Sequence, residues 1–114
     1  MALALTVVSV DAAADNLYIF GTVVASGSYA TGGDTFDFTT VASALEASQA
    51  PLQVWIGGTT GDGYSFVRAA PATLANGKIK INTASNTELA AGAYPARITG
   101  DTNIQFAATF AKLI

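Results

Sequence analysis

The chain of 114 residues contains neither cysteine nor histidine. Without cysteine it forms no disulfide and offers no thiolate to a metal. Without histidine it lacks the commonest general base and the commonest metal ligand of proteins. A serine triad therefore has no imidazole to activate its nucleophile. These absences argue against most hydrolytic and metal-dependent enzymes, so we expect a protein with no catalytic, cofactor-binding or metal-binding residues.

Charged residues are scarce as well, at 11% of the chain, whereas about a quarter is usual. The net charge of −3 argues against direct binding to nucleic acid. Residues 1–67 contain no basic residue, and all five basic residues lie from Arg68 onward. The acidic and basic halves could meet between neighbouring subunits, but mixing of the halves by strand pairing within one monomer is the simpler explanation. A surface this poor in charge also favours self-association.

Long apolar runs are missing too, since none approaches the roughly 18 residues that span a membrane. The start, MALALTVVSV, is apolar but lacks the lysine or arginine of an export signal. We therefore expect a protein that is made and used without export and without membrane contact. The length fits one domain, residues 1–114.

Short β-rich segments separated by glycine, asparagine, aspartate and proline dominate the chain. The first of them, residues 1–10, is a strand or an extended arm. The other predicted strands are 17–25, 35–39, 52–58, 64–70, 78–82, 96–99 and 103–114. Ser43 and Glu46 have the spacing of a capping box, which predicts one short helix near 41–48. The pattern predicts an all-β, single-domain β-sandwich or jelly-roll-like barrel of about eight short strands.

Glycine-bearing segments predict the tight connections of this fold. Gly21, inside a predicted strand, indicates a β-bulge or a close approach of the backbone. Residues 57–63, GGTTGDG, are too rich in glycine for a strand and are typical of a hairpin loop. Asn76-Gly77 fits a type I′ turn between a run near 70–74 and the strand 78–82.

Acidic and aromatic residues are the remaining candidates for function. Asp34 and Asp37 flank the start of a predicted strand, and Asp62 lies in a glycine-rich loop. Aspartate near turns usually bonds the backbone, so we do not assign these residues catalysis or calcium binding. Most aromatic residues lie in strands and should be core, but Trp55 alternates with its apolar neighbours and should face outward. An outward Trp55 is an interface anchor or, with Tyr64, a carbohydrate platform. The interface is favoured because no cluster of amide and acidic residues surrounds Trp55 in the sequence.

Several stretches together resemble a known family. They are the alternating N-terminal strand, LYIFGTVVASGSYATGGDTFDF at 17–38, NGKIKI at 76–81, ELAAGAYPARI at 88–98 and the phenylalanine-rich C-terminal strand. They resemble the small decoration, or cement, proteins that tailed bacteriophages attach to the outside of their capsids. The motifs mark turns rather than chemistry, and similar small β proteins occur as tail and fibre subunits.

The resemblance implies a non-enzymatic virion protein on the capsid exterior, assembled in the host cytoplasm. It implies a homotrimer that binds the major capsid protein and clamps neighbouring capsid subunits. Such proteins commonly touch the capsid with an arm or loop, which implies contacts around Leu3, Leu5 and Val7, with an ordinary strand as the alternative. Tyr29, at the start of the glycine-rich turn, and Trp55 complete the candidate interface residues. The alternative functions are a tail or fibre subunit and a carbohydrate-binding β-sandwich that uses Trp55.

Overall fold

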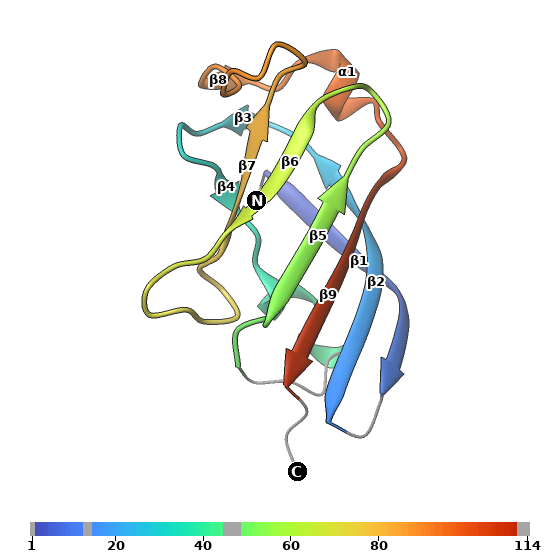
Figure 1. Ribbon diagram of the computed structural model, residues 1–114. Helices are drawn as coiled ribbons and strands as arrows, with labels where there is room; N and C mark the ends of the chain where they lie inside the picture. The colour runs from blue at the N-terminus through green and yellow to red at the C-terminus, as the bar shows by residue number, and fades with distance from the viewer. Residues whose placement is uncertain (1, 13–14, 45–48, 112–114) are drawn as a thin grey trace.

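The computed structural model describes residues 2–12, 15–44 and 49–111, which form three antiparallel sheets (Figure 1). The largest sheet has the strand order β1-β2-β9-β5, a second has the order β4-β7-β6, and β3 pairs with β8. The elements are β1 Leu3–Ala12, β2 Asn16–Ala25, β3 Ser28–Tyr29, β4 Asp34–Thr35, the 3₁₀ helix η1 Phe38–Ala44, β5 Gln53–Gly57, β6 Gly63–Val67, β7 Lys78–Asn82, β8 Gly92–Ala93, α1 Ala96–Thr99 and β9 Ile104–Ala111. The predicted all-β fold is confirmed, and the described strands do not close into a barrel.

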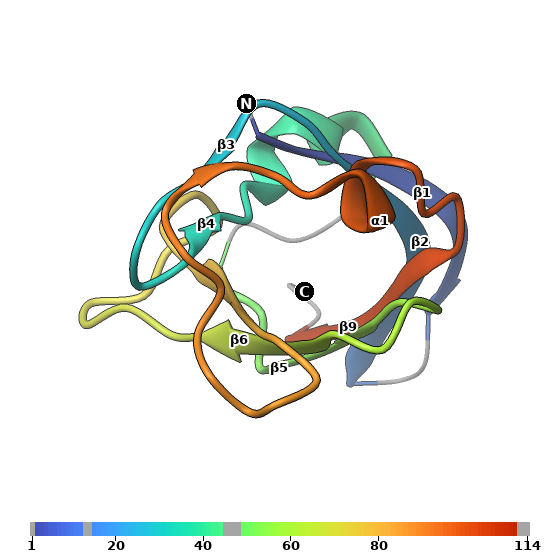
Figure 2. The same ribbon diagram turned by 90° about the horizontal axis from the view of Figure 1, so that it is seen from above.

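The core lies between the sheets, which surround one interior together with η1 and α1 (Figure 2). Alternate side chains of β2 and β9 fill this core, because every second residue of each strand is buried. Four phenylalanines form its aromatic centre, with ring centroids 5.0–5.9 Å apart in edge-to-face arrangements. They are Phe36, Phe38, Phe106 and Phe110.

At Gly21 strand β2 lies close to both of its neighbours, Thr6 of β1 and Phe106 of β9. The predicted close backbone approach is confirmed, since a Cβ on Gly21 would lie 2.6 Å from Cε1 of Phe106 and would overlap the carbonyl oxygen of Thr6. Opposite Gly21, β1 carries a bulge between Val7 and Ser9. The missing side chain thus lets the Phe106 ring pack directly on β2.

The helices differ from their predicted positions. The predicted strand 35–39 is shorter in the structure, because β4 ends at Thr35 and the 3₁₀ helix η1 begins at Phe38. Of the helix predicted near 41–48, residues 45–48 lie outside the described part of the chain. Residues 96–99 were predicted as a strand, which is wrong, because they form the helix α1. Pro95 sits at its N-cap position with a φ of −60°, and only Ile98 of this turn is buried. A single buried residue cannot distinguish a helical from an extended period.

Two predicted hairpins are also wrong. Residues 57–63 do not join paired strands, because β5 belongs to the large sheet while β6 pairs with β7. No strand forms near 70–74, and Asn76-Gly77 is not a type I′ turn, since Asn86 is the one described non-glycine residue with a positive φ. Gly77 instead leaves room for the Phe66 ring, whose Cε1 would lie 2.5 Å from an added Cβ.

Candidate functional site

The candidate site is the outer face of the four-stranded sheet, defined as the side chains of β1, β2, β9 and β5 that point away from the core. Strand pairing aligns these side chains in rows across the sheet. The central row is Ser9, Phe20, Ala107 and Trp55. Two further rows flank it, Asp11, Tyr18, Thr109 and Gln53 on one side and Thr6, Thr22, Gln105 and Gly57 on the other.

Two aromatic side chains dominate the outer face. Trp55 is 53% exposed and Phe20 is 48% exposed, with the small Ala107 between them. Because neighbouring strands lie about 4.8 Å apart, the two rings stand on backbone positions roughly 10 Å apart. The outward orientation of Trp55 confirms the prediction from its alternation, whereas Phe20 was not singled out from the sequence.

Charge is nearly absent from the outer face. Among the described residues of the three rows, Asp11 at the edge is the one charged side chain. Two amides flank Trp55, since Gln53 lies on its own strand and Gln105 on the neighbouring β9. Along the chain no cluster of amide and acidic residues surrounds Trp55, because Gln53 alone is near it and Gln105 approaches through the β5–β9 pairing.

The N-terminal interface candidates occupy the opposite side of this sheet. Leu3 and Leu5 are buried at 2% and 8% exposure, and Val7 is half-buried against the core. All three belong to β1, which pairs with β2 as an ordinary strand. The side chains of Leu3 and Leu5 are therefore not on a surface that a partner can touch, so the predicted extended arm is replaced by the alternative, a strand of the sheet.

Tyr29 is buried rather than on the surface, and its hydroxyl joins a hydrogen-bond network. Its hydroxyl donates to Oε2 of Glu88 at 2.8 Å and accepts from the Ile81 N–H at 3.2 Å. The same carboxylate accepts from the Gly32 N–H at 2.6 Å, and this bond and the one from Tyr29 lower the pKa of Glu88. The Tyr94 ring packs edge-on against Tyr29, with centroids 5.9 Å apart, and its hydroxyl donates to Asp34. Tyr29 thus fastens the glycine-rich turn to β7.

The predicted turn aspartates bond the backbone or a neighbouring cation. Asp37 accepts from the Thr39 N–H at 2.8 Å, as expected of a turn residue. Asp62 accepts two hydrogen bonds from Arg97, each 3.0 Å long. This ion pair joins an acid of the first half to a base of the second half within one monomer. It supports the simpler explanation of the charge distribution.

Asp101 holds the loop between the two large sheets. Its carboxylate accepts from the Thr59 N–H at 2.8 Å, the Thr59 hydroxyl at 2.9 Å and the Asn103 N–H at 2.9 Å. These bonds, the one from the Thr59 N–H foremost, lower the pKa of Asp101. Beside it, burial raises the pKa of Tyr64 to about 12, and its hydroxyl has no partner among the described residues. Tyr64 belongs to β6 and so does not share the outer face with Trp55.

Acid is expected to destabilise the protein partly through Asp101. Because the folded state lowers the pKa of Asp101 below its ordinary 3.8, the unfolded chain binds the proton more readily. The stabilisation is complete above pH 4 or so and disappears as the pH falls through the folded pKa. Urea midpoints should show Asp101→Asn below the parent at pH 7 and a smaller gap between the two at pH 3. An equal gap at both pH values would contradict this role.

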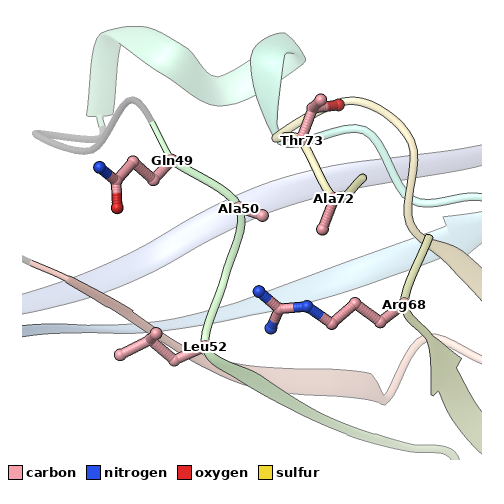
Figure 3. Close-up of a pocket in the computed structure, with 6 residues that line it drawn as sticks. All are labelled: Gln49, Ala50, Leu52, Arg68, Ala72 and Thr73. Carbon is pink, nitrogen blue, oxygen red and sulfur yellow. The ribbon is translucent and has the colours of Figure 1, made fainter. Parts of the chain in front are cut away.

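An open hollow of about 350 Å³ lies between the segment before β5 and the segment after β6 (Figure 3). It is lined by Gln49, Ala50, Leu52, Arg68, Ala72 and Thr73. The Arg68 guanidinium donates to the carbonyl oxygen of Pro51 at 3.0 Å, so part of its donor capacity holds the neighbouring loop. None of the predicted site residues lines this hollow.

Within residues 2–12, 15–44 and 49–111, no three carboxylates gather as a metal site, and no helix is long and apolar enough to cross a membrane. No family model, curated protein or solved structure matches the chain.

Proposed function

We propose that the protein is a non-enzymatic structural subunit that packs into a larger assembly through the outer face, and that this assembly is the capsid of a tailed bacteriophage. The observation that carries the packing role is the outer face itself, two exposed aromatic side chains on a sheet surface with one charged residue among those described. Contiguous exposed apolar surface of this kind marks interaction sites. The capsid as the assembly rests on the sequence resemblance.

The composition of the outer face suits a protein interface. Aromatic side chains are enriched among the residues that contribute most binding energy, and charged residues are depleted at the centre of interfaces. Trp55 and Phe20 supply the aromatic anchors, and the threonines and glutamines of the flanking rows supply a polar rim. On a capsid surface, many copies would add modest contacts into a firm attachment.

Removal of both aromatic anchors is expected to weaken capsid attachment at least tenfold. In the double variant Trp55→Ala/Phe20→Ala each truncation removes an exposed ring, and loss of a hot-spot residue costs about 2 kcal/mol or more. The measurement is co-sedimentation with expanded and unexpanded capsids of the virus that encodes the chain. Val67→Ala, which truncates a 40% exposed side chain on β6, is the matched control and should bind like the parent. Absence of parent binding to either capsid would overturn the proposal.

A second candidate function is carbohydrate binding, favoured by one specific observation. The amides of Gln53 and Gln105 flank the exposed Trp55, and an aromatic ring with nearby amides is a recognised platform for sugars. Retardation of the parent protein in native gels that contain a polysaccharide, abolished by Trp55→Ala, would support this function. If the protein binds sugar, remains monomeric and does not bind capsids, carbohydrate binding would replace the first proposal.

A further inference from the structure

The central row of the outer face alternates in size. Across the sheet order β1-β2-β9-β5, its side chains are Ser9, Phe20, Ala107 and Trp55, which are small, large, small and large in turn. Phe20 and Trp55 stand out into solvent at 48% and 53% exposure, whereas Ser9 and Ala107 beside them carry small side chains. The row is therefore a series of ridges and grooves of one-strand width.

A row with this order of sizes fits against a second copy of itself that runs in the opposite order. A two-fold axis parallel to the strands, placed between β2 and β9, turns the order small-large-small-large into large-small-large-small on the facing copy. Phe20 then lies over Ala107 of the second copy, and Trp55 lies over its Ser9. All four positions match a large side chain with a small one, the interdigitation by which aligned sheets pack about 10 Å apart.

The flanking rows are compatible with the same axis. In one row Tyr18 faces Thr109 and Asp11 faces Gln53. Asp11, the one charged side chain among the described residues of the three rows, thus meets an amide donor rather than its own copy. In the other row Thr22 faces Gln105, which again pairs hydrogen-bonding groups. A surface that binds its own copy must not bring like charges together. In this arrangement no like charges face each other among the described residues.

We propose that the outer face binds a second copy of this chain, face to face about a two-fold axis between β2 and β9. This inference rests on the proposed role of the outer face as a packing surface, and it names the partner of that face in the free protein. Because the capsid would contact the same rings, the dimer must dissociate before attachment. The pair is a dimer, in contrast to the trimer that the resemblance implies. The face measures roughly 20 Å by 20 Å from strand spacing and rise, which is small for a stable interface, so we expect a reversible dimer with a Kd in the micromolar range or weaker.

Sedimentation equilibrium of the free protein, without capsids, tests the dimer. Between about 5 μM and 1 mM, a range that brackets this affinity, the parent should pass from the 11.5 kDa of one chain to twice that mass. Ala107→Lys places a charge under the partner's Phe20 and should remain a single chain throughout, whereas Ala90→Lys, an exposed site outside the outer face, should dimerise like the parent. Circular dichroism melts confirm that both variants are folded.

A mixture of two variants tests which residues of the two copies face each other. Phe20→Glu alone should also stay a single chain. An equimolar mixture of Phe20→Glu with Ala107→Lys sets the introduced carboxylate of one chain against the introduced ammonium of the other in one of the two facing pairs, and it should restore the double mass. A parent that stays monomeric at the highest concentration, or that reaches three chain masses, overturns the dimer. Dimerisation of Ala107→Lys overturns the choice of face, and an unrescued mixture overturns the register.

The two proposals fail in different ways. If the protein dimerises but does not bind capsids, the capsid role is overturned and the inference stands. A parent that binds capsids yet remains monomeric at every concentration overturns the inference and leaves the capsid role standing.

Discussion

Phe38→Ala is expected to lower the free energy of unfolding by about 3–5 kcal/mol, which is the cost of a phenylalanine-sized cavity in a packed core. Phe38 is fully buried and packs edge-to-face against Phe36, Phe106 and Phe110. It therefore ties the start of η1 to β9 and to the segment after β4. Because small domains are stable by only about 5–15 kcal/mol, the variant should lose much of its stability. Urea unfolding followed by circular dichroism measures the loss.

The matched control is Phe20→Ala on the outer face of the four-stranded sheet. Phe20 is half exposed in the monomer, so its truncation removes little buried area and should cost below about 1 kcal/mol at concentrations where the chain is monomeric. Equal losses for the two variants would mean that the four-phenylalanine cluster is not the centre of the core.

Gly21→Ala is expected to cost about 1–3 kcal/mol or more, the range for overpacking a tight site. The added methyl would overlap the carbonyl oxygen of Thr6 and press on the Phe106 ring, so either the β1 bulge or the ring must move. The measurement is again the urea midpoint, with the slope of the transition checked for a change in compactness.

Gly57→Ala provides the control for this glycine. Gly57 also lies in a strand of the large sheet, but an added Cβ meets nothing within 4 Å. Its substitution should be neutral or slightly stabilising, because alanine reduces the freedom of the unfolded chain. If both substitutions had the same effect, the close packing of Phe106 on β2 would be refuted.

Alternation of side chains was enough to predict the strands that build the large sheet. The outward Trp55 follows from a period of two, which local sequence carries directly. The role of Gly21 followed from the same pattern, because glycine inside an otherwise apolar strand has few explanations other than a bulge or a close contact.

The connections could not be predicted, because a turn signal does not name the strand that follows it in space. The loop 57–63 has the composition of a hairpin, yet Asp101, distant in the sequence, holds it as a bridge between two sheets. Asn76-Gly77 has the sequence of a type I′ turn, but the Asn76 side chain bonds Thr73 and Pro71 instead. Tertiary contacts decided both conformations.

Only part of the candidate site could be predicted from the sequence. Trp55 was identified, whereas the row to which it belongs depends on the insertion of β9 between β2 and β5. No local pattern reports that order, so Phe20 and Ala107 could not be placed beside Trp55. Leu3 and Leu5 have the apolar alternation of an arm or of a core strand, and only the pairing with β2 distinguishes the two.

The position of β9 also determines when the protein can fold. Asn16 pairs with Ala111 and Gln53 with Thr109, so both neighbours of β9 must wait for a strand that the ribosome makes long after them. A nascent chain that has not reached Ile104 exposes the open edges of β2 and β5 and half of the aromatic cluster. Such non-local pairing slows folding to milliseconds or longer and leaves edges that invite aggregation. Synthesis of the last strand, rather than of the first hairpin, is therefore the event that commits this chain to its native structure.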